Sequence, residues 1–484
     1  MREPFDVLVI GAGVVGCAIA REMSRYQLRV GLLERELDLA MGNSGRNSGV
    51  LHGGFTYATG SLRAQTCVEG NHEFESVAAE LNVPFKRSGK VVVGFTDADM
   101  KSLERFKARG EANDVRGLEI VDKKRLAELD PSAIGEFALF SPDSGILDPM
   151  AYTVALAENA AMNGAEFLFG REVSAASRRE GLWELTASGE TFLTRWVVNS
   201  AGMDSARISA MLGIPGYVLR GFKGEYFVLD KKAGAFLKMP VYPAPDEKGG
   251  FATHATPTIH GNVLIGPDSY VVDDFADFSS RKNRMDDLVR DGLRMFAQVK
   301  PEYFIRNFAG IRPKRINPET GEVLDFVCEA RDEAPGVINL VGIESPGLTG
   351  ALPLARRALG LLAARESLKP NPSFDPKRPA RPVFAEADGQ TRARLIAEDP
   401  EHGEIICRCE TVTKAEILSA IRALPGAKTL DGIKIRTRAM MGRCQGGYCQ
   451  TRVARILRDE LGLPTEGILL GRKGSKMFTG SVRE

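Results

Sequence analysis

The order of apolar and polar positions at the start of the chain predicts a strand, a helix and a second strand. Residues 5–10 form a short apolar run typical of a buried strand, and apolar positions recur at helical spacing over residues 14–25. Residues 29–33 form a second apolar run, which ends at Glu34 and Arg35. This alternation is typical of the first βαβ unit of a nucleotide-binding domain.

Helix and strand patterns are mixed through the middle of the chain. The predicted elements of this region lie at residues 90–95, 99–110, 150–164, 183–187, 226–229, 262–266, 339–342 and 352–366. The mixture favours a substrate domain of α+β type that is inserted into the nucleotide-binding core. We place these insertions at about residues 85–150 and 215–310, within a first domain of residues 1–369.

The composition of the chain changes after residue 369. Five prolines lie between residues 370 and 382, which favours an extended linker over residues 370–400. Four of the seven cysteines follow, in residues 401–484. The predicted fold is therefore α/β, with a Rossmann-like domain, its inserted substrate domain and a small helical C-terminal domain.

Length and charge limit the functional classes. At 484 residues the chain is long enough for two or more domains, and a net charge of +1 gives no bulk attraction to nucleic acid. No run of about 18 apolar residues occurs, and no secretory signal precedes the first strand. We expect a cytoplasmic protein without a transmembrane segment or a nucleic-acid partner. A peripheral association with the inner face of the membrane stays open.

Gly11, Gly13 and Gly16 form a GxGxxG pattern between the first strand and the first helix. The first glycine permits a tight turn, the second lets the backbone approach a diphosphate, and the third lets the helix pack closely on the strand. Glu34 ends the second strand, with Arg35 beside it, where an acid can accept hydrogen bonds from ribose hydroxyls. The pattern predicts dinucleotide binding, against the alternative of a glycine-rich turn without a ligand.

Two further loops favour FAD over NAD. The first, residues 43–54, carries Ser44, Arg46, Asn47 and Ser48 among glycines, so its backbone can approach a diphosphate and a flavin ring. The second follows a strand, precedes a helix and contains three candidate residues, Gly347, Leu348 and Thr349. A helix start at that place can stabilise the anionic reduced flavin. The alternative is a simple turn between strand and helix.

The C-terminal cysteines form two close pairs, Cys407 with Cys409 and Cys444 with Cys449. Four thiolates from two loops predict a metal site, either zinc or an iron–sulfur cluster. One residue between the first two cysteines is short for a zinc knuckle. Thr413 and Glu416 form a capping box that starts a helix after the first pair, and a helix is expected at 450–461 after the second.

Several motifs carry a resemblance to the D-amino-acid-oxidase superfamily of flavoproteins, over about residues 5–365. Within it the chain resembles the L-2-hydroxyglutarate dehydrogenase/oxidase branch, whereas its layout with a C-terminal cysteine domain resembles anaerobic glycerol-3-phosphate dehydrogenases. The superfamily motifs are the glycine fingerprint and residues 47–52, 199–202 and 310–313, and the branch motifs are residues 220–226, 241–246 and 264–268. The resemblance implies FAD as the cofactor, with Gly202 in its site.

The cysteine segment resembles the bacterioferritin-associated-ferredoxin-like domain. That resemblance implies a [2Fe–2S] cluster with four ligands, Cys407, Cys409, Cys444 and Cys449. Zinc and a redox-active thiol site are the alternatives.

Oxidation of a CH–OH group needs a base and a group that binds the substrate. His52 follows the first flavin loop, and His254 occupies a position where the hydroxyglutarate branch also has a histidine. Arg312 is our candidate for binding an anionic group, with Lys314 as a second positive charge. Structural histidines and a solvated basic loop are the alternatives. Weaker candidates are Arg220 and Lys223, and we expect His72 and His402 at the surface.

These observations predict a FAD-dependent dehydrogenase that oxidises a small anionic substrate. Our first expectation is glycerol 3-phosphate, with L-2-hydroxyglutarate as the alternative. Electrons would leave through the cluster to a protein subunit or a quinone-linked partner, and we expect an oligomer. Two other readings stay open, namely an amine or imino-acid dehydrogenase subunit and a non-enzymatic electron carrier.

Overall fold

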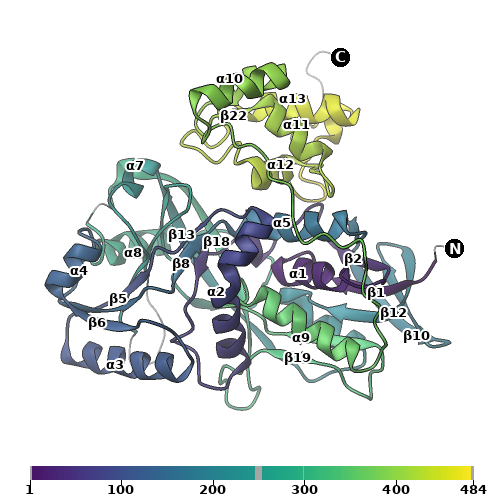
Figure 1. Ribbon diagram of the computed structural model, residues 1–484, viewed down its shortest axis with the longest axis horizontal. Helices are drawn as coiled ribbons and strands as arrows, with labels where there is room; N and C mark the ends of the chain where they lie inside the picture. Colours follow the sequence, from purple (N-terminus) through teal and green to yellow (C-terminus); the bar gives the residue numbers. More distant parts are fainter. Residues whose placement is uncertain (1–2, 246–252, 298, 481–484) are drawn as a thin grey trace.

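The computed structural model describes residues 3–245, 253–297 and 299–480. Asp246, which ends one of the branch motifs, lies outside the described residues. Figure 1 shows two β-sheet regions side by side and a small helical domain, in light green and yellow, that sits on top of them. The larger regions contain a Rossmann-like sheet and a mixed sheet, as the sequence predicts.

The Rossmann-like sheet is built on parallel strands. β1 (Phe5–Ile10) pairs in parallel with β2 (Val30–Glu34) and β12 (Glu190–Asn199), and the outer parallel strands are β9 (Glu166–Phe169) and β20 (Val337–Val341). Antiparallel strands extend it, namely β10 (Val173–Arg179), β11 (Leu182–Ala187) and β19 (Val327–Glu329). Each parallel strand ends at the same edge of the sheet, so the loops that follow them converge there.

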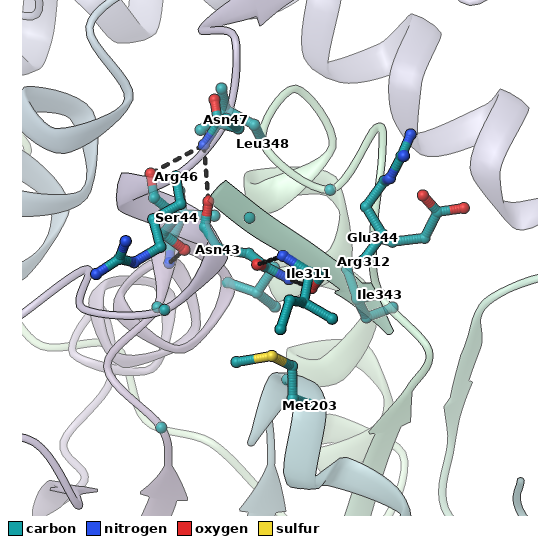
Figure 2. Close-up of a pocket in the computed structure, with 18 of the residues that line it drawn as sticks. Asn43, Ser44, Arg46, Asn47, Met203, Ile311, Arg312, Ile343, Glu344 and Leu348 are labelled. Atoms are coloured by element: carbon teal, nitrogen blue, oxygen red, sulfur yellow. Dashed lines mark hydrogen bonds between the residues drawn. The ribbon is translucent and has the colours of Figure 1, made fainter. Parts of the chain in front are cut away.

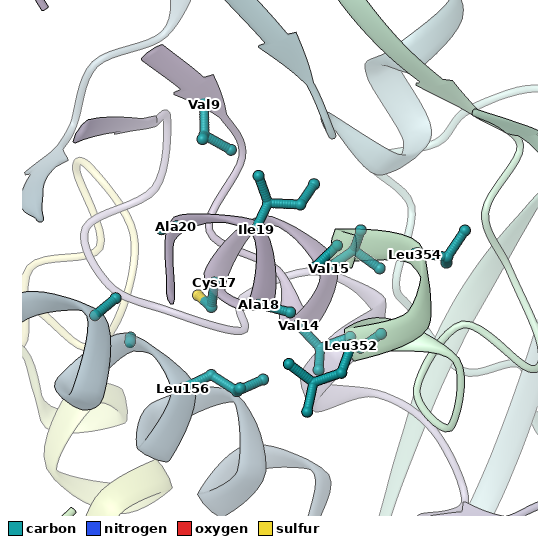
Figure 3. Close-up of a cluster of buried hydrophobic side chains, with 14 of the residues drawn as sticks. Val9, Val14, Val15, Cys17, Ala18, Ile19, Ala20, Leu156, Leu352 and Leu354 are labelled. Atoms are coloured by element: carbon teal, nitrogen blue, oxygen red, sulfur yellow. The ribbon is translucent and has the colours of Figure 1, made fainter. Parts of the chain in front are cut away.

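Helix α1 (Val14–Met23) is enclosed on all sides, because each of its residues is buried. It lies between α5 (Pro149–Met162) and α9 (Ala351–Ala363), and Figure 3 shows Val14 beside Leu352 at the contact. α2 (Leu62–Leu81) packs against α9, and α6 (Ser205–Met211) covers β20. This core fixes the start of α1, which is where the glycine fingerprint lies.

The second sheet is mixed and combines two separate segments of the chain. Its strands are β5 (Lys90–Gly94), β6 (Glu119–Asp122), β7 (Phe137–Ser141), β13 (Leu219–Leu229), β14 (Val241–Pro243), β15 (Ala255–Pro257), β16 (Val263–Ile265), β17 (Tyr270–Val272) and β18 (Phe304–Arg315). Helices α3 (Asp97–Ala112), α4 (Lys123–Leu129), α7 (Lys231–Gly234) and α8 (Lys282–Leu293) flank it. A small sheet of β3 (Val50–Leu51), β8 (Gly145–Leu147) and β4 (Phe85–Lys86) lies nearby. The long β13–β18 pair carries Arg312 and Lys314 toward the Rossmann-like domain.

The C-terminal domain is small and mainly helical. It contains α11 (Lys414–Arg422), α12 (Leu430–Thr437) and α13 (Gln450–Leu461), with the short strands β21 (Ile405–Cys407) and β22 (Val412–Thr413). The capping box of Thr413 and Glu416 is formed as predicted. One expectation is wrong: His402 is buried, because it stacks on Phe384 and its Nδ1 lies 3.1 Å from the Thr413 hydroxyl.

The stretch that we predicted as an extended linker is partly helical and is held to the protein. α10 (Gly389–Glu398) begins at Asp388, whose side chain accepts a hydrogen bond from the backbone of Thr391. Upstream, Arg378 forms a 2.6 Å ion pair with the buried Glu158. Pairing with the Rossmann-like domain therefore fixes the course of this segment, which composition alone does not reveal.

Among the helices of the described residues, none combines the length and the apolar composition that crossing a membrane requires.

Candidate active site

A cavity of about 520 Å³ runs between the two sheets, a volume typical of a cofactor or ligand site. The sequence-predicted residues that line it are Gly11, Gly13, Glu34, Arg35, Ser44, Arg46, Asn47, Ser48, His52, Gly202, His254, Arg312, Lys314, Gly347 and Leu348. Two predicted residues, Gly16 and Thr349, lie behind this lining. The fold thus brings almost every candidate of the first domain to one place.

The glycine fingerprint forms a tight turn at one end of the cavity. Gly11 has a φ of +106°, and a side chain there would lie 2.7 Å from the carbonyl oxygen of Ser200. At Gly16 a side chain would lie 1.9 Å from the carbonyl oxygen of Gly11, so this glycine serves the packing of helix on turn. The turn therefore brings the backbone close to the part of the cavity where a diphosphate would bind.

The carboxylate of Glu34 lies at the end of β2, beside this turn. It accepts hydrogen bonds from the backbone of Ala12 at 2.7 Å and Glu36 at 2.8 Å. Burial raises the pKa of Glu34, and the two backbone donors oppose that rise. The residue is thus oriented toward the fingerprint, as expected for an acid that would bind ribose hydroxyls.

The first flavin loop is locked to the substrate domain by a residue that the sequence analysis did not single out. The Asn43 side chain bonds both backbone groups of Ile311 on β18, accepting from its N–H at 3.0 Å (Figure 2). The Asn47 amide donates to the carbonyl oxygens of Asn43 and Ser44, and the Ser44 hydroxyl accepts from the N–H of Val14. Asn47 therefore shapes the loop and also lines the cavity, and its role as a cofactor ligand stays a prediction.

His52 lies beside the second flavin loop. Its Nε2 is 3.4 Å from the Ser345 hydroxyl, and its backbone N–H donates to the hydroxyl of Thr349 at 3.1 Å. Burial, together with the nearby charge of Lys90, lowers the pKa of His52 to about 3. The imidazole is therefore neutral near pH 7, and the lowered pKa makes it a weaker base than an exposed histidine.

Arg312 and Lys314 reach the cavity from alternate positions of β18. The Arg312 guanidinium donates to two backbone carbonyl oxygens, of Asp268 at 3.2 Å and of Phe222 at 3.4 Å. Within residues 3–245, 253–297 and 299–480, no carboxylate forms an ion pair with it. Burial lowers the pKa of Lys314, whose ammonium lies 4.7 Å from the Phe222 ring centroid. The pair offers positive charge that the surrounding side chains leave available for an anion.

The weaker cationic candidates lie elsewhere. Arg220 is exposed and does not line the cavity. Lys223 is fully buried, where it forms a 3.0 Å ion pair with Asp277. Strand alternation explains Lys223, which lies on the opposite face of the sheet from Arg312. Arg220 pairs with Lys314 and shares its face, but it lies outside the cavity lining.

His254 belongs to a cluster that the sequence analysis missed. Its ring stacks on Tyr242 with centroids 3.7 Å apart, and the Lys90 ammonium lies 3.6 Å from the Tyr242 centroid. Both Lys90 and Tyr242 line the cavity. The sequence contains one indication of this cluster, because Lys90 is the first residue of the otherwise apolar strand β5. Lysine is rarely buried without a function or a partner.

The burial of Lys90 predicts that the free energy of unfolding depends on pH. Burial lowers its pKa from 10.5 to about 7, so between pH 7 and 10 the unfolded chain holds this proton and the folded protein does not. Its contribution to the free energy of unfolding therefore rises with pH, by up to about 1.4 kcal/mol per unit. Urea denaturation at pH 7, 8 and 9 should show the wild type gaining stability relative to Lys90→Met.

The matched control for this prediction is Lys101→Met, which removes an exposed lysine of α3. Its stability difference from the wild type should stay constant over the same range. Parallel pH curves for Lys90→Met and the wild type would contradict the prediction.

The four cysteines of the C-terminal domain form two thiol pairs. Cys407 hydrogen bonds with Cys449, and Cys409 hydrogen bonds with Cys444. Two pairs suit a centre with two irons, each bound by two thiolates, better than one tetrahedral zinc.

Backbone donors stabilise thiolates in both pairs. The Cys449 thiol and the backbone N–H of Met440 lower the pKa of Cys407, and the backbone N–H of Tyr448 lowers the pKa of Cys444. Cys407 and Cys449 are buried, whereas Cys409 and Cys444 are exposed. The site thus has one face toward the domain core and one toward solvent.

The loop that carries Cys444 also rests on the substrate domain. Arg306 of β18 donates to the Gln445 side chain at 3.1 Å, and Arg443 forms a 3.0 Å ion pair with Asp230. The same strand continues to Arg312, so the cysteine loop and the cavity share one structural element.

Comparison with known protein families agrees with this geometry. The family model described as FAD dependent oxidoreductase (DAO) matches residues 6–360. The chain belongs to the DAO family. A second model, the BFD-like [2Fe-2S] binding domain, matches residues 405–459. The predicted oxidoreductase class, FAD and the [2Fe–2S] cluster are thereby confirmed.

Relatives of this DAO family member include dehydrogenases and oxidases. It is 36% identical over 482 residues to a glycerol 3-phosphate dehydrogenase of Caloramator mitchellensis, covering 99% of each chain. It is 31% identical over 401 residues to a mitochondrial L-2-hydroxyglutarate dehydrogenase of Arabidopsis thaliana, covering 73% of this chain and 82% of the relative. The FAD-bound L-alpha-glycerophosphate oxidase of Mycoplasma pneumoniae has a similar structure, with a TM-score of 0.74, 27% identity and coverage of 79% and 100%.

Proposed function

We propose that this protein is a FAD-dependent dehydrogenase that oxidises glycerol 3-phosphate to dihydroxyacetone phosphate. The observation that carries the proposal is the Arg312 guanidinium, which lines the cavity with Lys314 and has no carboxylate partner among the described residues. A guanidinium binds phosphate through two parallel hydrogen bonds, and a lysine adds a point charge. The relative from Caloramator, named for this substrate, supports the same choice over the full chain.

The proposed base is one of the two cavity histidines. His52 is neutral near pH 7 because burial lowers its pKa, which leaves a ring nitrogen unprotonated and able to face the substrate hydroxyl. The same shift makes His52 a weaker base than an exposed histidine. Its contact with the Ser345 hydroxyl, at 3.4 Å from Nε2, orients the ring. His254 is the alternative base, held in place by its stacking on Tyr242.

The remaining cavity residues orient the substrate and limit the access of water. Tyr226, Tyr242 and Leu348 line the cavity, and the Tyr226 hydroxyl lies 3.3 Å from that of Ser48. When bound, FAD supplies the acceptor for the hydride of the CH–OH carbon, and the cluster supplies a one-electron carrier. The two thiol pairs, with one exposed side, would hold that carrier where a partner can reach it.

The [2Fe–2S] domain indicates electron transfer, and we infer that the acceptor is a protein subunit or a quinone-linked partner. We also infer an oligomer in the cytoplasm, with peripheral association at the inner face of the membrane as the alternative. Sedimentation of cell fractions and of the purified protein tests both inferences.

Anaerobic bleaching of the flavin absorbance tests the substrate. The purified holoprotein is mixed with glycerol 3-phosphate, L-2-hydroxyglutarate, or a set of amino and imino acids. We expect fast and complete bleaching with glycerol 3-phosphate and not with any of the other compounds. Bleaching only with another compound would reassign the substrate, and no bleaching with any would favour an electron carrier.

L-2-hydroxyglutarate dehydrogenase is the second candidate. The relatives from Arabidopsis and other organisms favour it, and Arg312 would equally bind a carboxylate. The bleaching rates distinguish the two, since one substrate carries a phosphate and the other two carboxylates.

Replacement of Arg312 by alanine should impair substrate binding while FAD stays bound. The loss of charge-assisted hydrogen bonds costs about 1.5–3 kcal/mol, so kcat/KM should fall by about 10- to 100-fold, mainly through KM. Steady-state kinetics and the flavin content measure the two effects. Arg220→Ala is the matched control, because Arg220 is an exposed arginine of the paired strand that does not line the cavity. Unchanged kinetics in Arg312→Ala would remove Arg312 from the site.

A further inference from the structure

A hairpin-like loop of the C-terminal domain reaches the FAD cavity. Leu469 and Lys476 form an isolated bridge at its base. The loop is tied to the start of α12, because the carbonyl oxygens of Leu469 and Leu470 accept from the N–H groups of Leu430 at 3.1 Å and Asp431 at 2.7 Å. The position of the loop therefore follows that of α12.

Helix α12 is in turn fixed to the Rossmann-like domain. Its Arg436 forms two hydrogen bonds with Asp38, at 2.8 and 3.0 Å, and both side chains are 1% exposed. Next to the loop, the Lys473 ammonium donates to the carbonyl oxygen of Gly170 at 2.9 Å. Two separate contacts thus hold the loop against the nucleotide-binding domain.

The tip of this loop places Arg472 in the cavity lining, opposite residues of the first domain. Arg472 lies 5.3 Å from the ring centroid of Phe278, and Arg46 of the first flavin loop lies 4.4 Å from the same ring. The Arg472 Nε is 3.8 Å from a carboxylate oxygen of Glu36, which is longer than a normal hydrogen bond. Two guanidinium groups from different domains therefore meet at one part of the cavity.

Nearby carboxylates offset the charge of these two arginines only in part. Burial lowers the pKa of Arg46, and the positive charge of Arg472 lowers it further, whereas Asp431 and Glu36 oppose that fall. Like charges that are close together and partly removed from water repel each other, and an anion between them relieves the repulsion. The start of α1 lines the same cavity, and the positive end of a helix also favours a bound anion.

We propose that Arg472 is a FAD-binding residue contributed by the iron–sulfur domain, and that with Arg46 it neutralises the diphosphate of the cofactor. Retention of FAD then depends on the docked C-terminal domain. The proposal rests on the binding of FAD and not on the identity of the substrate, so the two can fail separately.

The test measures FAD binding to the full-length protein after removal of its flavin, without any substrate. Arg472→Ala should raise the Kd, read from quenching of flavin fluorescence, by at least about 10-fold. Its Kd should also depend less steeply on salt concentration than that of the wild type, because one charge contact is lost. Arg472→Lys keeps the charge, so it should retain the salt dependence with an intermediate Kd.

Arg452→Ala is the matched control, since Arg452 is an exposed arginine of α13 that does not line the cavity. Iron and sulfide content shows that the domain is folded in each variant. An unchanged Kd in Arg472→Ala overturns the proposal. A raised Kd with the salt dependence of the wild type also overturns it, because Arg472 would then support only the shape of the cavity.

Discussion

A Cys444→Ser variant is expected to keep substrate-driven bleaching of the flavin and to lose electron delivery to a one-electron acceptor. Cys444 is an exposed thiol paired with Cys409, and the backbone N–H of Tyr448 lowers its pKa and so favours the thiolate. A serine hydroxyl is a poor substitute for a thiolate ligand, because iron–sulfur clusters are held by cysteine thiolates. This is the largest change that we expect from any single substitution.

Two measurements on the purified holoprotein separate the outcomes. Iron and labile sulfide content reports the cluster, and anaerobic mixing with substrate followed by oxidised cytochrome c reports electron delivery. Cys328→Ser is the matched control, because Cys328 is a half-buried cysteine of β19 outside the quartet. Loss of flavin bleaching in Cys444→Ser would mean that the cluster supports the fold of the cavity. Undiminished electron delivery would remove the cluster from the exit route.

The second large effect is expected from the buried ion pair between the domains. Arg436→Met leaves the Asp38 carboxylate, 1% exposed, without its partner. Breaking a buried pair on one side costs about 3–5 kcal/mol, because the remaining charge stays out of water. We expect the C-terminal domain to separate from the Rossmann-like domain at a lower temperature, which calorimetry and protease sensitivity of the 370–400 segment would detect.

The double variant Asp38→Leu with Arg436→Met tests the cause. Removing both charges leaves no buried ion, so most of the lost stability should return. Arg458→Ala is the control at an exposed pair with Asp459, where a change of about 1 kcal/mol or less is expected. Equal losses in the single and double variants would show that packing, and not the buried charge, explains the effect.

The Arg436 pair also links this prediction to cofactor binding. It fixes α12, and α12 carries the loop that brings Arg472 to the cavity. Arg436→Met should therefore also weaken the retention of FAD if Arg472 binds the diphosphate as proposed.

Local patterns determined much of this protein before any long-range contact was known. The strand Phe5–Ile10 and the helix Gln450–Leu461 have the bounds that the sequence predicts, and α1 begins at the predicted residue. The glycine fingerprint and the capping box are also formed as expected. These features depend on residues close together in the chain, so periodicity, glycine conformation and capping chemistry suffice to find them.

Several predicted site residues line one cavity, and their roles there stay predictions. Glu34, His52 and Arg312 reach the cavity because the ends of parallel strands and the β13–β18 pair meet there. Asn47 and Lys223 show the limit of such reasoning. Both have a suitable residue type, but the Asn47 side chain bonds to the backbone of its own loop and the Lys223 side chain bonds to the half-buried carboxylate of Asp277.

The tertiary structure alone decided how the parts of the chain are joined. Lys90 meets Tyr242 across the mixed sheet, Arg436 pairs with Asp38 across 398 residues, and Arg472 enters the cavity of another domain. None of these contacts has a local signal, because each depends on how separately folded segments pack. The sequence by itself therefore determined the elements, the cofactor motifs and the four cysteines. Packing between domains decided which charges are buried, which are paired and which are left to bind an anion.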